Sequence, residues 1–168
     1  MSDFVHLHLH SEYSLLDGAA SIKKVIKKAK EYNMTSVAIT DHGAMYGVID
    51  FYEYANKIGV KPVLGCEVYV AARGHKDKVH ELDSSSSHLI LLAENNTGYK
   101  NLIKIVSAGF TEGFYYKPRV DYDLLNEQKK KGVAVIFIGE DLDVLMGLSD
   151  RLMVLCGGEV SGIVDPRE

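Results

Sequence analysis

The stretch His6-Leu7-His8-Leu9-His10 lies near the start of the chain and alternates histidine with leucine. Successive side chains of an extended strand point to opposite faces, so the three imidazoles share one face and the leucines pack on the other. Histidine is the commonest metal ligand because its neutral ring nitrogen donates a lone pair. The alternation predicts a strand over residues 4–10 with a metal-binding face; the alternative is a strand whose histidines are only solvated.

A second cluster, Thr40-Asp41-His42-Gly43, ends a predicted strand over residues 36–40. His42 adds another imidazole, and we expect Asp41 to fix the tautomer of a ligand ring from behind it. In the next predicted strand, residues 61–71, alternation places Glu67 on the face that we expect the histidines to share, which makes it a candidate carboxylate ligand. Cys66 lies on the opposite face, where we expect it to pack.

The composition fits one soluble domain. The chain has 168 residues, of which 46% are hydrophobic, and a formal net charge of -4 from 19 basic and 23 acidic residues. This charge argues against nucleic-acid binding by bulk electrostatics, although a local basic patch stays open. Cys66 and Cys156 are too few for a disulfide framework. There is no apolar run long enough to cross a bilayer and no signal-peptide pattern, so we expect a cytoplasmic protein that binds no membrane.

Hydrophobic periodicity predicts alternating strands and helices, and therefore an α/β fold with a parallel sheet or partial barrel. Besides the strands above, it predicts strands over residues 88–94 and 133–138 and a hairpin of residues 151–156 and 159–164. Helices are predicted over residues 21–32, from Val48 through Phe51, Tyr52 and Ala55 to Gly59, and over residues 97–110, 121–131 and 141–148, with Ser21 and Thr97 as N-caps. The segment 73–87 has no periodicity and is expected to be a mobile loop with His75 and His80 exposed.

Five motifs follow one another along the chain: His6-Leu7-His8-Leu9-His10-Ser11, Leu15-Leu16-Asp17-Gly18, Ile39-Thr40-Asp41-His42-Gly43, Leu64-Gly65-Cys66-Glu67 and His88-Leu89-Ile90-Leu91-Leu92-Ala93 with Thr97-Gly98-Tyr99-Lys100-Asn101-Leu102. Together they resemble the polymerase-and-histidinol-phosphatase (PHP) domain, and more narrowly the version found in the alpha subunit of bacterial replicative DNA polymerase III. The resemblance covers residues 1–125.

The resemblance implies a distorted (β/α) barrel with divalent metal ions, zinc or manganese, at one mouth. The metal ligands that it implies are His8, His10, Asp17, His42, Glu67 and His88. His6 occupies a position where many relatives have a supporting acid behind the ligands, and no catalytic residue beyond the metal site is implied. Such a site hydrolyses a phosphate ester or a DNA 3′ end, and in polymerase-linked relatives it implies a 3′ to 5′ proofreading exonuclease in DNA replication.

The chain departs from the family pattern after His88, because it contains no later histidine. The family domain is usually longer and takes further ligands from its later strands. We therefore expect a weakened phosphoesterase. The alternative is a non-catalytic metal-binding or scaffold module.

Residues 126–168 are similar to the end of an ABC transporter ATPase of the nucleoside or sugar importer type, through Val133-Ala134-Val135-Ile136-Phe137-Ile138-Gly139-Glu140-Asp141. This similarity suggests a chimera whose strand, helix and hairpin complete the barrel within one domain; the alternative is a divergent PHP tail. No P-loop is present, so no ATP binding is expected. A partial barrel exposes sheet edges, so we expect a homo-oligomer formed through them.

The run Tyr115-Tyr116-Lys117-Pro118-Arg119 combines aromatic and basic side chains. Such a run can stack on and pair with a nucleic-acid strand. The commoner case is a loop whose aromatic side chains pack beneath it, and we favour that interpretation.

Overall fold

The computed structural model describes residues 4–129, 146, 151–156 and 159–166. The chain divides into two compact units, residues 1–136 and residues 137–168. The first unit contains an open five-stranded sheet with helices, and the second contains a two-stranded hairpin. Within the described residues, no helix has both the length and the apolar character needed to span a membrane.

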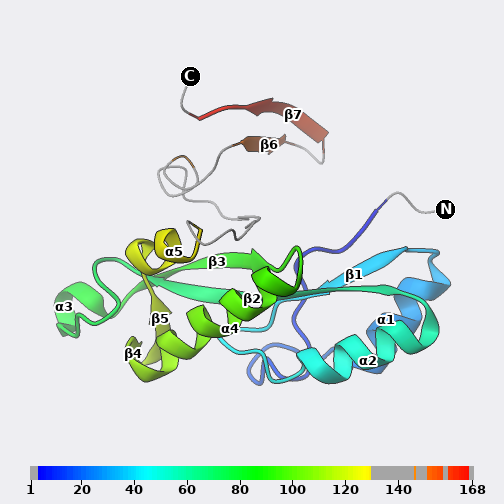
Figure 1. Cartoon of the computed structure of the whole chain (residues 1–168), viewed down its shortest axis with the longest axis horizontal. Coiled ribbons are helices and arrows are strands. Elements are labelled where there is room, and N and C mark those ends of the chain that lie inside the picture. The colour runs from blue at the N-terminus through cyan, green and yellow to red at the C-terminus, as the bar shows by residue number, and fades with distance from the viewer. Residues whose placement is uncertain (1–3, 130–145, 147–150, 157–158, 167–168) are drawn as a thin grey trace. The chain divides into compact units, whose positions relative to one another are not determined.

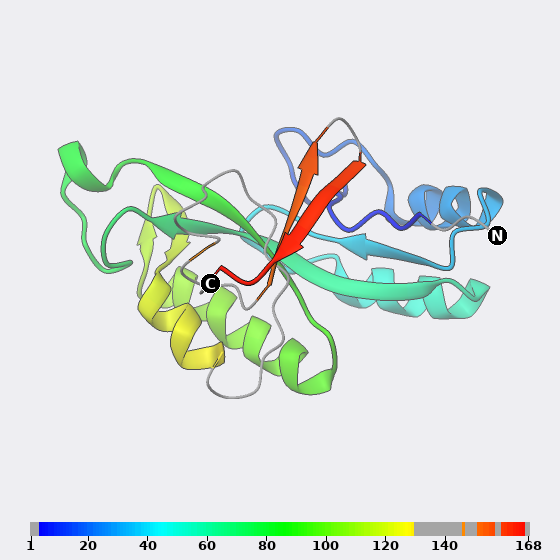
Figure 2. The ribbon, with the colours of Figure 1, turned by 90° about the horizontal axis from the view of Figure 1, so that it is seen from above.

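The sheet of the first unit is organised around one long strand, β2 (Lys61–Ala71). The strands that pair with it directly are β1 (Ser36–Ile39), β3 (Ser86–Leu92) and β5 (Lys117–Val120), while β4 (Phe114–Tyr115) pairs with β5. β1 and β5 run parallel to β2, whereas β3 runs antiparallel to it over the whole length of β3. Figure 2 shows β2 and β3 alongside each other. The fold is therefore mixed α/β.

The expected barrel is not seen, because the strands of the described residues form an open sheet. A (β/α) barrel requires parallel neighbours joined by helical crossovers. Here β2 and β3 are joined by a segment that contains only the short helix α3 (His80–Asp83). Antiparallel strands need no long crossover between them, and the segment that joins β2 to β3 accordingly places β3 antiparallel to β2.

The long helices of the first unit are amphipathic. They are α1 (Ile22–Glu31), α2 (Val48–Ile58), α4 (Asn96–Thr111) and α5 (Tyr122–Lys129). Figure 1 shows α1, α2 and α4 along one side of the sheet. The periodicity of α1 predicts Ile22, Val25, Ile26 and Ala29 as its inward residues; Ile22, Ile26 and Ala29 are buried, and Val25 is partly buried against the same core cluster. Tyr52, one of the residues whose spacing predicts α2, is 51% exposed.

The helix ends follow the sequence closely. Ser21 occupies the N-cap position of α1, although its side chain makes no capping hydrogen bond. Gly59 follows α2 with φ 77°, the left-handed conformation that favours glycine. The expected cap of α4 is wrong by two residues, because Asn95 Oδ1, not Thr97, accepts from the backbone N–H of Thr97 at 2.9 Å and of Gly98 at 3.0 Å. An asparagine carbonyl at the N-cap satisfies these otherwise unpaired donors.

The N-terminal segment is not the strand predicted over residues 4–10. It runs beside β1 through two backbone hydrogen bonds, in which Ala38 N–H and Thr40 N–H donate to the carbonyls of His6 and Leu9, both at 2.9 Å. The Leu9 N–H donates to the Thr40 hydroxyl at 2.8 Å. A side chain thus takes the place of a backbone acceptor, which interrupts the backbone pairing between the N-terminal segment and β1. The expected alternation still holds, since Leu7 and Leu9 each pack against a core cluster.

The segment 73–87 is structured, contrary to expectation. It contains α3 and the start of β3. Buried Asp83 accepts from Arg73 Nε at 2.9 Å and Nη2 at 2.6 Å. Arg119, only 2% exposed, donates to the carbonyls of Asp83, His75 and Asp77, which supports the packing interpretation for this arginine and removes it as a nucleic-acid contact.

Of the two histidines expected to be exposed in this segment, only His80 is. The His75 side chain is 12% exposed and pairs with Asp121. The partner lies far along the chain, after β5, so the burial of His75 depends on a long-range contact.

The second unit contains the predicted hairpin. β6 (Leu152–Cys156) pairs antiparallel with β7 (Glu159–Val164), with a register shift between Val154 and Leu155. Four predicted features lie outside the described residues: the Gly157-Gly158 turn, the strand over residues 133–138, the last two residues of the helix over residues 121–131, and the helix over residues 141–148 apart from Met146.

Candidate metal centre

The six ligands expected from the sequence come together in the first unit, from five parts of the chain. His8 and His10 lie on the N-terminal segment and Asp17 on the loop before α1. His42 follows β1, Glu67 lies on β2, and His88 lies on β3. Their ligand atoms form three overlapping groups, each with all its atoms within 4.8 Å of one another: His8, His10 and Glu67; His10, Asp17 and His42; and His42, Glu67 and His88.

The sheet register positions the residues that follow or lie on its strands. β1 is parallel to β2, and beyond its end His42 forms an isolated bridge with Glu67, in which Gly43 N–H donates to the Glu67 carbonyl at 2.7 Å. On the other edge, β3 pairs His88 with Tyr69. Glu67 and Tyr69 are two residues apart on β2 and share a face, so His88 lies diagonally across from Glu67 on that face.

Glu67 is the residue on which the imidazoles converge. Its side chain is 4% exposed. Oε2 lies 3.2 Å from Nε2 of both His8 and His10. Oε1 lies 2.8 Å from Nδ1 of His42 and 2.9 Å from Nδ1 of His88. One buried carboxylate therefore faces four imidazole nitrogens.

Asp17 extends the cluster toward solvent. Its side chain is 60% exposed, and Oδ2 lies 2.9 Å from Nε2 of His42. The hydrogen bond with His42 lowers the pKa of Asp17 below its ordinary value, so the carboxylate stays ionised. Burial lowers the pKa of His8, an effect to which the neighbouring imidazoles add and which Glu67 opposes. His8 is therefore kept in the neutral form that binds a metal ion.

The donor set fits a divalent cation. His42 Nδ1 and Glu67 Oε1 are buried and only 2.8 Å apart, yet neither has a hydrogen-bond partner within the described part of the chain. Buried polar atoms without partners are costly, and a cation that takes both lone pairs removes that cost. Imidazole nitrogen and carboxylate oxygen suit both zinc and manganese.

Hydroxyl groups orient two of the imidazoles. The Thr40 hydroxyl donates to the Leu9 carbonyl at 3.2 Å, so its oxygen is left to accept from His8 Nδ1 at 2.9 Å. The Ser14 hydroxyl donates to Asp41 Oδ1 at 2.7 Å and accepts from His10 Nδ1 at 3.0 Å. These bonds assign the ring proton to Nδ1 and leave Nε2 of both rings free to face Glu67.

The two residues expected behind the ligands are placed differently. Asp41 is 2% exposed and contacts serines, not an imidazole: it accepts from Ser11 N–H at 2.6 Å, Ser11 Oγ at 2.7 Å and Ser14 Oγ at 2.7 Å. It therefore acts on His10 only through Ser14. His6 is exposed, and its ring packs edge-on against Phe4 at 4.8 Å.

Sequence reasoning missed Ser14 and Thr40 as supporting residues. Thr40 stands in the Asp-His motif, and a hydroxyl neighbour of a ligand motif is a signal that could have identified it. Ser14 lies four residues after His10 in a loop without regular structure, where no periodicity indicates which way a side chain points. Cys66 packs as expected: it is fully buried, and burial raises the pKa of its thiol.

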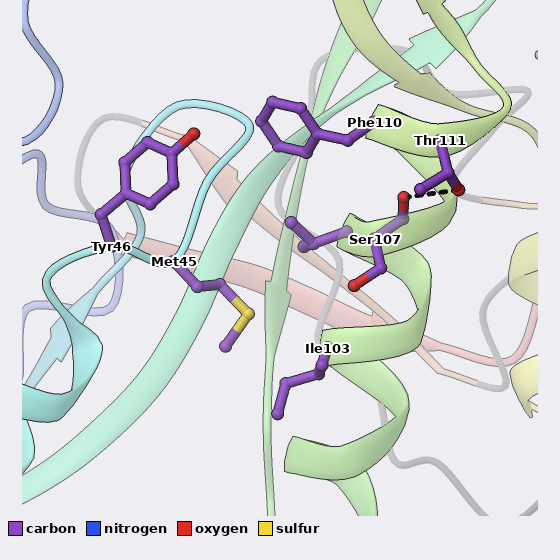
Figure 3. Close-up of a pocket in the computed structure, with 7 residues that line it drawn as sticks. Met45, Tyr46, Ile103, Ser107, Phe110 and Thr111 are labelled. Carbon is purple, nitrogen blue, oxygen red and sulfur yellow. Dashed lines mark hydrogen bonds between the residues drawn. The ribbon is translucent and has the colours of Figure 1, made fainter.

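An apolar pocket lies apart from this cluster in the first unit. Figure 3 shows it beside α4, with Met45 and Tyr46 facing Ile103 and Phe110. Its lining contains no histidine, cysteine or carboxylate, so it offers no metal ligand and no strong acid or base.

The sequence matches the family model of the PHP domain over residues 6–162. The chain belongs to the PHP domain family. The match runs through most of residues 126–168, and none of the comparisons supports the expected ABC ATPase segment or a chimera.

This PHP domain has curated relatives named DNA polymerase III subunit alpha. The one from Borreliella burgdorferi is 53% identical over 127 residues, covering 75% of this chain and 11% of the relative. The one from Chlamydia trachomatis is 46% identical, covering 76% of this chain and 10% of the relative. The chain thus spans about a tenth of the length of these relatives.

Among solved structures, an amidohydrolase from Chromobacterium violaceum is 25% identical in sequence, with a TM-score of 0.42. The match covers 62% of this chain and 34% of the amidohydrolase chain.

Proposed function

We propose that this PHP domain is a metal-dependent phosphoesterase whose divalent ions, zinc or manganese, are held by His8, His10, Asp17, His42, Glu67 and His88. One observation carries this proposal: four imidazoles converge on buried Glu67, and Glu67 Oε1 and His42 Nδ1 have no hydrogen-bond partner among the described residues. If hydrogen bonds alone held the Glu67 carboxylate in place, Glu67 Oε1 and His42 Nδ1 would each have a hydrogen-bond partner.

Bound divalent ions supply Lewis-acid chemistry, by lowering the pKa of water and stabilising charge on a phosphoryl oxygen. The residues of the chain provide the setting for it. Thr40 and Ser14 hold the rings of His8 and His10 with Nε2 inward. The half-exposed side chains of Asp17, His8 and His88 leave the cluster open to solvent, which gives a substrate access to it.

The substrate that we propose is a phosphodiester, and in particular the 3′ end of a DNA strand, in keeping with a proofreading role in DNA replication. The support is the kinship with relatives named DNA polymerase III subunit alpha. The net charge of -4 means that any contact with DNA must rely on local groups and on the bound cations.

Elemental analysis combined with a hydrolysis assay tests the proposal. The purified chain is expected to hold two or more divalent ions and to hydrolyse bis(p-nitrophenyl) phosphate. His10→Ala should abolish hydrolysis, whereas His80→Ala, which removes an exposed histidine outside the cluster, should not. One ion or none, together with no hydrolysis by the unmodified chain, would instead indicate a scaffold module.

We also propose that copies of the chain associate through the sheet edges. The support is the open sheet, in which β3 and β4 each have one edge without a partner strand among the described residues. Light scattering after size-exclusion chromatography tests this, and a monomer throughout the micromolar range would contradict it.

A further inference from the structure

Lys117 lies beside the candidate metal centre, although it belongs to none of the groups of metal ligands. It is the first residue of β5, and its Nζ lies 4.3 Å from the centre of the Tyr69 ring. That ring packs in turn against His42, at 6.1 Å between centroids, and against His88, at 5.1 Å. The parallel register pairs Tyr69 with Arg119, so stepping back two residues on each strand brings Lys117 level with Glu67.

Within the part of the chain that the structure describes, the ammonium group of Lys117 is not neutralised by a carboxylate. Two other lysines of the described residues form ion pairs: Lys28 Nζ lies 3.0 Å from Glu31 Oε2, and Lys76 Nζ lies 2.6 Å from Glu112 Oε2. For Lys117, no carboxylate of the described residues lies within ion-pair distance, and its side chain is exposed. A cation over an aromatic face is held by the electrons of the ring, which leaves its N–H groups available to an acceptor.

A lysine in this position has an electrostatic cost if the cluster holds divalent cations, because like charges repel in a partly desolvated site. An anion bound between the ammonium and the cations turns that cost into an attraction. Lysine is an effective point charge for phosphate oxygens, and charge-assisted hydrogen bonds to them are stronger than neutral ones. The combination of an unpaired lysine with a cation-binding cluster therefore suits a phosphate.

We infer that Lys117 binds a phosphate oxygen of the substrate at this centre, and that Tyr69 positions it by holding the ammonium over its ring. The inference rests on the proposed metal-dependent function. It adds an anion-binding residue from β5 to a centre whose metal ligands all come from residues 8–88.

The test measures phosphate binding separately from hydrolysis. Inorganic phosphate is titrated calorimetrically into the full chain in the presence of Mn²⁺, with Lys117→Met, Lys117→Arg and Lys61→Met as variants. Lys61 is the matched control, because it is an exposed lysine at the far end of β2, roughly 20 Å of strand away from Glu67. Thermal unfolding and elemental analysis verify that each variant is folded and holds the same metal.

Phosphate is expected to bind Lys117→Met about tenfold more weakly than the unmodified chain, the loss typical of one hydrogen bond to a charged group. Lys117→Arg should keep most of the affinity and Lys61→Met all of it. Unchanged phosphate affinity in Lys117→Met, or no phosphate binding by the unmodified chain, would overturn the inference. If the unmodified chain fails to hydrolyse bis(p-nitrophenyl) phosphate but its phosphate binding depends on Lys117, the anion site stands and the proposed hydrolysis fails.

Discussion

Glu67 Oε1 and His42 Nδ1 lie 2.8 Å apart without forming a hydrogen bond. The two atoms come from a strand and from the loop after its parallel neighbour, and both are buried. Two electron-pair donors this close together can both bind one cation, which is the role proposed for them above. This relationship links the sheet register directly to the candidate metal centre.

Replacing Glu67 with glutamine should remove metal binding at the centre of the cluster. The amide keeps the shape of the side chain but has no negative charge, and only one of its two terminal atoms can donate a lone pair. Adding Mn²⁺ or Zn²⁺ should raise the melting temperature of the unmodified chain and leave that of Glu67→Gln unchanged. Thermal unfolding with and without a chelator measures this, and an equal metal-induced rise in the variant would contradict the assigned ligand.

Replacing Ser14 with alanine should weaken metal binding without removing a ligand. The variant loses the acceptor of His10 Nδ1 and one donor to Asp41, so the His10 ring is no longer held with Nε2 inward. Loss of such support typically costs about 10–100-fold in metal affinity. Competition with a fluorescent chelator measures the affinity. Ser87→Ala, at an exposed position of β3, is the control and should bind metal as the unmodified chain does.

Ionisation of Asp83 should make the free energy of unfolding depend on pH in the acid range. The hydrogen bond from Arg73 lowers the pKa of Asp83 to about 2 from 3.8. Because the folded state favours the ionised form, the contribution is complete above the unfolded pKa and is lost as pH falls through the folded value. The free energy of unfolding should therefore decline from about pH 4 toward pH 2 more steeply in the unmodified chain than in Asp83→Asn.

Urea titrations of the metal-free protein at several pH values measure this dependence. Working without metal removes the pH dependence of metal binding, and the comparison with Asp83→Asn cancels the titration of the ligand cluster, which both proteins share. Parallel pH profiles for the two proteins would show that the pair formed by Arg73 and Asp83 does not contribute.

Gly43 should tolerate a side chain less well than Gly59. Both have positive φ, 59° and 77°, so alanine costs about 1–2 kcal/mol of backbone strain at either position. A Cβ at Gly43 would also lie 2.9 Å from Pro118 Cγ and 3.0 Å from Tyr69 Cε2, whereas nothing lies within 4 Å at Gly59. Gly43→Ala should therefore lower the free energy of unfolding more than Gly59→Ala does. Equal losses in urea unfolding would show that the Tyr69 contact relaxes freely.

The sequence by itself determined the local structure and the set of converging residues. Short-range periodicity and turn chemistry predict four features that the structure contains: the bounds of β2, the inward face of α1, the end of α2 at Gly59 and the hairpin in the second unit. The six candidate ligands were identified from motifs, and the structure brings their ligand atoms together.

Only the tertiary structure decided how these parts pair. Four features depend on contacts between residues that are distant in the chain or lie in irregular loops. They are the antiparallel direction of β3, the interruption of pairing by the Thr40 hydroxyl, the support of His10 by Ser14 and the burial of His75 against Asp121. Periodicity reports which face of an element is apolar, but it carries no information on the partner or its direction. Those choices depend on which long-range arrangement satisfies the buried polar groups, and that is a property of the folded chain as a whole.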